Sequence, residues 1–128
     1  MNDGLNATVE VSPKNLKPFM SNEAQLTIRL DAPANAPRYW AEAIIEVPHM
    51  FSLQPGAEVE RSRTLLGIIG GGSAAREKKI RIFTLNSIYP DTYKVRVTFF
   101  VYAEDGVIAE RKETFAEIEC GDHNAEIL

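Results

Sequence analysis

The stretch from Leu65 to Ala103 constrains the fold of this chain more than any other part. Apolar residues recur at alternate positions around Ile80 and again after Tyr93. Turn-forming residues separate these runs: Gly70-Gly71-Gly72-Ser73 and Tyr89-Pro90-Asp91-Thr92. A period of two predicts strands with one buried and one exposed face, and Gly and Pro clusters predict the turns between them. The stretch therefore predicts successive strands of an all-β protein.

The rest of the chain shows the same alternation, with turn residues roughly every ten positions, which is typical of a β-sandwich. The expected strands cover residues 5–11, 26–30, 40–47, 63–69, 76–84, 93–102 and 107–120. We expect a bulge near Phe115-Ala116, where the alternation is irregular. The length of 128 residues suits one domain. We therefore expect a single all-β domain over residues 1–128, with 121–128 as a disordered tail.

Tyr93 supports a particular kind of sandwich. It follows a turn by one residue and is itself followed by alternating apolar residues. This is the pattern of a tyrosine corner, in which the tyrosine hydroxyl bonds to nearby backbone. We therefore expect an immunoglobulin-like antiparallel β-sandwich of seven to eight strands, with Tyr93 in a structural role. Ligand binding by Tyr93 is the alternative.

Charge and composition exclude several classes of function. The net charge of -4 argues against a nucleic-acid partner, which requires a basic surface. No apolar run approaches the roughly 18 residues of a membrane-spanning helix, so we expect no membrane insertion. The chain has one cysteine and so cannot form an internal disulfide.

Several segments resemble CARDB-like and related immunoglobulin-like domains of microbial proteins. The matching runs are Val11-Ser12-Pro13, Leu26-Thr27-Ile28-Arg29-Leu30, Ile45-Glu46-Val47-Pro48, Leu66-Gly67-Ile68-Ile69-Gly70-Gly71-Gly72-Ser73, Lys79-Ile80-Arg81-Ile82 and Pro90-Asp91-Thr92-Tyr93-Lys94-Val95. The resemblance implies a sandwich of a kind common on exported proteins. The chain departs from that pattern by its single copy, its lack of a signal peptide and Asp91 in place of glycine. A native start at Met1 would indicate the cytoplasm, and a fragment of an exported protein the cell surface.

No set of residues predicts a catalytic or metal site. The glycine run lacks the Gly-Lys-Ser/Thr of a phosphate-binding loop. His49, His123 and Cys120 could just supply three zinc ligands, but without motif spacing. A nucleophilic Cys120 would need a base beside it. We therefore expect no cofactor, no metal and no enzymatic activity.

The outer face of one sheet is the candidate binding surface. If the uniformly apolar side chains of 40–47 and 93–102 point inward, the alternate ones point outward. In this fold the two strands are neighbours, with the last strand beside them. The outward residues predicted to bind a protein are Trp40, Ile44, Arg96, Phe100, Tyr102 and Phe115. Two alternatives stay open: a register slip that makes Trp40 a core residue, or burial of the face beneath the loop at 48–62.

We therefore expect a non-enzymatic interaction module that uses this aromatic face to bind itself, as a homodimer, or an unidentified protein. Aromatic and arginine side chains commonly dominate the energy of protein interfaces. The alternative function is a structural spacer within a larger cell-surface or exported protein. An enzyme is the third and least supported class.

Overall fold

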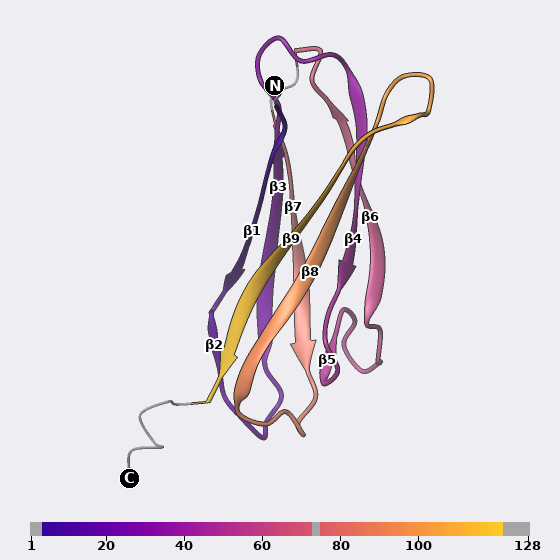
Figure 1. The fold of residues 1–128 in the computed structure, drawn as a ribbon. Helices are drawn as coiled ribbons and strands as arrows, with labels where there is room; N and C mark the ends of the chain where they lie inside the picture. The colour runs from indigo at the N-terminus through magenta and orange to yellow at the C-terminus, as the bar shows by residue number, and fades with distance from the viewer. Residues whose placement is uncertain (1–3, 73–74, 122–128) are drawn as a thin grey trace.

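The computed structural model describes residues 4–72 and 75–121, which form nine strands in two sheets (Figure 1). The first sheet, sheet A, has the order β1-β3-β7-β5: β1 (Asn6–Ser12), β3 (Glu23–Asp31), β7 (Ala75–Thr84) and β5 (Phe51–Ser52). The second, sheet B, has the order β2-β9-β8-β4-β6: β2 (Asn15–Leu16), β9 (Ile108–Cys120), β8 (Asp91–Tyr102), β4 (Tyr39–Glu46) and β6 (Arg61–Ile69). The expected all-β sandwich is confirmed.

The strand count exceeds the expected seven to eight because two strands have only two residues each, too few to show alternation. β2 pairs in parallel with the end of β9, so one pair in the fold is not antiparallel. β5 pairs with β7 through Phe51 opposite Thr84 and Ser52 opposite Phe83. Both short strands are defined by long-range pairing rather than by a local pattern.

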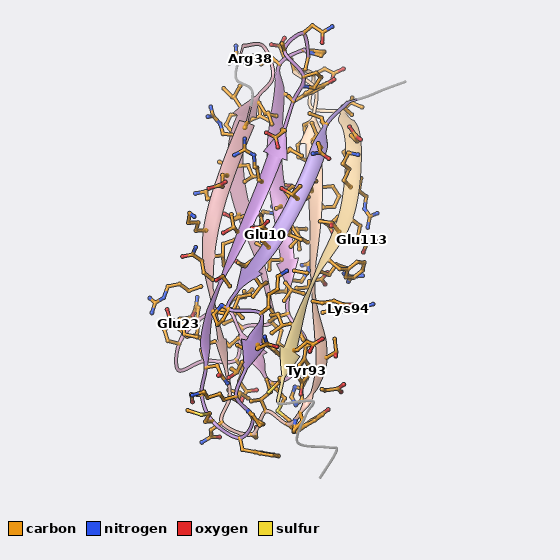
Figure 2. All side chains as sticks on the ribbon, turned by 90° about the vertical axis from the view of Figure 1, so that its left-hand side faces the viewer. Glu10, Glu23, Arg38, Tyr93, Lys94 and Glu113 are labelled. Carbon is orange, nitrogen blue, oxygen red and sulfur yellow. The ribbon has the colours of Figure 1, made fainter. Side chains whose placement is uncertain are left out.

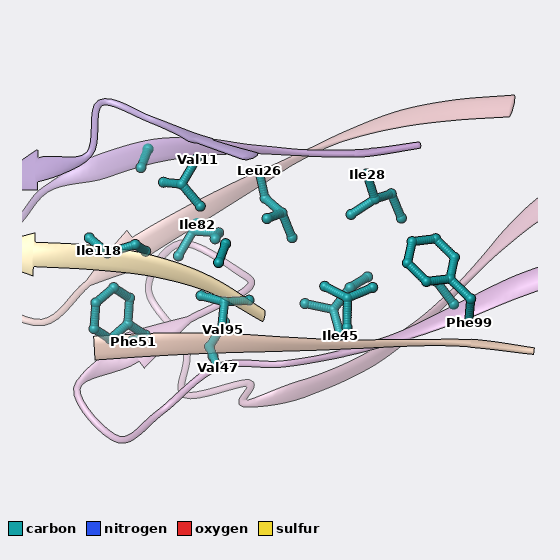
Figure 3. Close-up of a cluster of buried hydrophobic side chains, with 14 of the residues drawn as sticks. Val11, Leu26, Ile28, Ile45, Val47, Phe51, Ile82, Val95, Phe99 and Ile118 are labelled. Carbon is teal, nitrogen blue, oxygen red and sulfur yellow. The ribbon is translucent and has the colours of Figure 1, made fainter. Parts of the chain in front are cut away.

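Alternate residues of the long strands meet between the sheets and form one core (Figure 3). In sheet A, Leu26, Ile28 and Leu30 of β3 are completely buried. In sheet B, Val95, Val97, Phe99 and Val101 of β8 and Ala41, Ala43 and Ile45 of β4 face them. Burial of such side chains contributes roughly 1.5–3 kcal/mol each for the larger ones. The apolar faces expected for residues 26–30, 40–47 and 93–102 are the buried ones.

The bulge expected near Phe115-Ala116 lies instead at the start of the same strand. The pairing of β8 with β9 is regular through Phe115-Ala116 and shifts between Val101 and Tyr102, which face Glu110 and Ile108. The extra residue is therefore Ala109, next to the hairpin. The irregular alternation near Phe115-Ala116 comes from Phe115 itself, an apolar residue whose side chain lies on the solvent-facing side of β9. Phe115 is 51% exposed.

Tyr93 forms the expected tyrosine corner. Its hydroxyl donates a hydrogen bond of 2.6 Å to the backbone carbonyl of Tyr89. Its ring packs edge-on against Phe51, with the ring centroids 5.1 Å apart. The bond closes the loop between β7 and β8 at the lower end of the sandwich (Figure 2).

The part of the chain described by the structure has no helix long and apolar enough to cross a membrane. The tail expected at 121–128 lies, apart from Gly121, outside the described residues, as does His123.

Candidate functional site

The outward-facing residues of sheet B form rows across its strands. The register pairs Trp40 with Tyr102, Glu42 with Phe100, Ile44 with Thr98, and Glu46 with Arg96. Because Ala41, Ala43 and Ile45 on β4 are buried, the side chains between them lie on the opposite, outer face. The expected facing of both strands is confirmed, and Trp40 is a surface residue that is 47% exposed.

One end of this face is apolar, and we call it the aromatic end: Trp40, Leu65, Phe100, Tyr102 and Ile108. Tyr102 lies between Trp40 on β4 and Ile108 on β9. Leu65 is 56% exposed and Ile108 is 53% exposed. The aromatic end therefore presents apolar surface from four adjacent strands.

A pocket of about 290 Å³ opens within the aromatic end. Its lining residues are Trp40, Ala41, Glu42, Leu65, Tyr102, Ala103, Glu104 and Gly106. The Tyr102 hydroxyl donates a 2.6 Å hydrogen bond to Oε2 of Glu42. This bond, with partial burial, raises the pKa of Tyr102 because it favours the protonated phenol. Nε of Arg63 lies 3.5 Å from Oε1 of the same carboxylate.

The rows beyond the aromatic end are charged. Arg96 contacts Glu46 at 2.7 Å and Glu113 at 3.2 Å, which links β4, β8 and β9. The pKa of Arg96 is raised by its hydrogen bond with Glu46 and by the negative charge of that group. Figure 2 shows Glu113 and Lys94 projecting on the outer side of sheet B. Between these charges and the aromatic end, Ile44 is half-buried and Thr98 is buried.

Phe115 does not join the other aromatic residues. The register places Arg111 beside Phe100, Glu113 beside Thr98 and Phe115 beside Arg96. Phe115 therefore lies two rows from Phe100, with the row of Thr98 between them. The ammonium of Lys94 lies 5.9 Å from the centre of the Phe115 ring. The expectation of a single patch that includes Phe115 is corrected to an aromatic end and a separate phenyl group.

The loop at 48–62 does not cover the aromatic end. Its strand β5 belongs to sheet A, and Phe51 is 1% exposed inside the core. The hydroxyl of Ser52 accepts hydrogen bonds from the backbone of Gln54 and Val59, which fixes the loop on that side. Both alternatives, a buried Trp40 and a covered face, are therefore wrong.

The other candidate groups are occupied in structural contacts. His49 lies 3.3 Å from a carboxylate oxygen of Glu60. Cys120 is buried, and burial raises the pKa of its thiol, which opposes thiolate formation. Within residues 4–72 and 75–121, no three His, Cys, Asp or Glu side chains are grouped so that they could hold a metal ion.

Sequence reasoning missed Leu65 and Ile108. The pairing of β4 with β6 shifts at Ala41 and Glu42, which face Gly67 and Leu65, so Leu66 is the extra residue. The bulge shifts the alternation by one residue, so that Leu65 lies opposite Glu42 and is exposed on the outer face, while Leu66 is buried. Ile108 lies next to the bulge in β9. Local alternation does not reveal a bulge, although the paired leucines were a weak signal.

No protein-family model matches this chain, and no curated protein sequence matches it. Among solved structures, a non-cellulosomal cohesin from the archaeon Archaeoglobus fulgidus is 9% identical over 94% of this chain and 96% of its own, with a TM-score of 0.52. The bacterial hydrophobin BslA is 12% identical over 91% of this chain and 95% of its own, with a TM-score of 0.53. A CARDB domain from Pyrococcus furiosus is 11% identical over 93% of this chain and 90% of its own, with a TM-score of 0.44. The expected resemblance to microbial β-sandwich domains is confirmed at the level of the fold.

Proposed function

We propose that this domain is a non-enzymatic protein-interaction module that binds another copy of itself or a different protein through the outer face of sheet B. The observation that carries the proposal is the aromatic end. Trp40, Leu65 and Ile108 are each about half exposed on neighbouring parts of one sheet. Clustered apolar groups on a protein surface commonly mark an interface.

The two parts of the face have different roles in this proposal. Burial of the Trp40 and Tyr102 rings, with Phe100 beside them, supplies most of the binding free energy because aromatic side chains bury large apolar areas. Ile44, Arg96 and Phe115 lie at the rim of the contact. Arg96 is about half exposed and already paired, so it contributes mainly to orientation.

The test is the molar mass by light scattering across a concentration series, for the native chain and for Phe100→Glu and Leu65→Glu. We expect the native mass to rise above 14.3 kDa with concentration, and both variants to lower the association. A buried carboxylate without a partner is costly at an interface. Phe19→Glu is the matched control, because Phe19 is 67% exposed in the turn after β2.

Far-UV circular dichroism and urea unfolding establish that each variant folds. A mass that stays at 14.3 kDa across the series excludes self-association. In that case the proposal requires a different protein whose capture by the native chain is lost in Phe100→Glu and kept in Phe19→Glu. Capture that is equal in all variants would favour a spacer domain instead.

A further inference from the structure

The pocket in the aromatic end has the dimensions of a site for one side chain. Trp40 and Tyr102 lie directly across from each other on β4 and β8, and both line it. Its volume of about 290 Å³ is at the lower limit for sites that hold a whole small molecule. The pocket is open to solvent on the face that we propose as the interface.

Both charged side chains that line the pocket are acidic. Glu42 lies in the next row from Trp40, and its side chain is only 14% exposed. Glu104 follows β8 at the rim. Arg63 is 70% exposed on the edge strand and contacts one oxygen of Glu42 at 3.5 Å. A carboxylate can accept about four hydrogen bonds, so Glu42 can take a further donor beside Tyr102 and Arg63.

Aromatic rings and carboxylates attract the same class of group. The faces of Trp and Tyr rings attract cations, and Trp does so most strongly. An apolar side chain in the pocket would remove water from Glu42 without replacing its hydrogen bonds, which is unfavourable. An anionic side chain would be repelled by Glu42 and Glu104. The lining therefore discriminates by charge.

We infer that the pocket between Trp40 and Tyr102 receives a cationic side chain, arginine or lysine, from a partner protein. This inference rests on the proposed function, because it names the chemistry of the partner at the same face. The net charge of -4 also favours approach of a basic partner. The incoming cation competes with Arg63 for Glu42.

The test uses the fluorescence of Trp40, which is the only tryptophan of the chain. The protein is titrated with a short uncharged peptide that carries one central arginine, and with the same peptide carrying citrulline. Citrulline keeps the shape of arginine and removes its charge. We expect the arginine peptide to change the Trp40 emission with an affinity about tenfold or more above that of citrulline, and added salt to weaken it.

Three charge variants make the test specific. Glu42→Gln keeps an acceptor for Tyr102 and removes the charge, so we expect the affinity for the arginine peptide to fall about tenfold. Arg63→Gln removes the competing cation, so we expect the affinity to rise. Glu113→Gln is the control, because it removes one negative charge from the same face, two rows away from Tyr102, and should leave the affinity within about twofold.

Equal responses to arginine and citrulline, or equal affinities of Glu42→Gln and Glu113→Gln, would overturn the inference. No response to either peptide would overturn it as well. These failures are distinguishable from failure of the proposed function, since the titration needs no natural partner. If the protein associates through Phe100 but does not discriminate arginine from citrulline, the proposed interface stands and the cation pocket is rejected.

Discussion

Gly70 ends β6 where the chain leaves sheet B for sheet A. Its φ of +80° lies in the left-handed region that favours glycine. A Cβ atom placed on Gly70 would lie 1.9 Å from the carbonyl oxygen of Pro37. The next residue, Gly71, donates a backbone hydrogen bond of 2.9 Å to Ala36. Glycine is therefore required at position 70 by close contact with the loop before β4.

This contact predicts different costs for two alanine substitutions in the run. Gly72 has a φ of +102° and open space around its Cβ position, so Gly72→Ala should cost only the conformational strain of about 1–2 kcal/mol. Gly70→Ala adds a steric clash and should cost roughly 1–3 kcal/mol more. Urea unfolding of both variants measures the difference. Equal costs would show that the loop at 36–37 moves freely.

The raised pKa values of three residues determine how the free energy of unfolding changes at alkaline pH. Burial raises the pKa of Cys120 and of Tyr93, and the hydrogen bond to Glu42 raises that of Tyr102. The unfolded chain releases these protons near pH 8.5 for Cys and near pH 10 for Tyr. Above those values the folded state binds more protons than the unfolded state, so the free energy of unfolding falls as pH rises.

We expect this fall to begin at about pH 8.5 and to steepen near pH 10. Urea unfolding across this range measures it. Cys120→Ala should flatten the first part, and Tyr93→Phe should reduce the second. The slopes are compared, because each variant also changes the absolute stability. A native protein whose stability does not change above pH 8.5 would contradict the assigned pKa directions.

At the scale of elements, the two-residue strand β5 contributes more to the core and to the position of its loop than its length indicates. Phe51 fills the core beside Tyr93, and Ser52 is 1% exposed with its hydroxyl bonded to Gln54 and Val59. The two residues hold the loop at 53–60 against sheet A, and so leave the outer face of sheet B uncovered. Pairing with β7, rather than strand length, gives this segment its place.

Phe51→Ala is therefore expected to lower the free energy of unfolding by about 3–5 kcal/mol, because it leaves a cavity in the core. Phe115→Ala is the matched control in β9. Phe115 is 51% exposed, and its loss should cost less than about 1 kcal/mol. Both values come from urea titrations followed by circular dichroism. Similar costs for the two phenylalanines would contradict the structural role of β5.

At the scale of the whole molecule, both sheets contribute to one continuous core. Each sheet covers the apolar face of the other, so neither can lose its contacts without exposing the other to water. Chains of this size with one core commonly unfold in a single cooperative step. The expectation of one domain can therefore be tested by comparing unfolding at two places in the molecule.

We expect urea unfolding followed by Trp40 fluorescence to coincide with unfolding followed by far-UV circular dichroism. Trp40 reports on the aromatic end of sheet B, and circular dichroism reports on all strands. Coincident midpoints support a single cooperative unit. An earlier midpoint for Trp40 would mean that β4 and its end of sheet B separate first, contrary to one domain.

The sequence determined the features that depend on a local period. Alternation identified the seven longer strands and the buried faces of β3, β4 and β8, because a strand packed on one side requires apolar residues at every second position. The turn before Tyr93 identified the tyrosine corner, since its hydrogen bond spans only four residues. Both signals lie within a few residues of the feature that they predict.

Only the tertiary structure decided which outward residues become neighbours. The register between strands brings Ile108 beside Tyr102 and Leu65 beside Glu42, in the row next to Trp40, and keeps Phe115 two rows from Phe100. The bulges at Leu66 and Ala109 change the facing of adjacent residues, and β5 joins sheet A through β7. These features depend on pairing between distant segments, and a period of two within one strand carries no information about its partner's register.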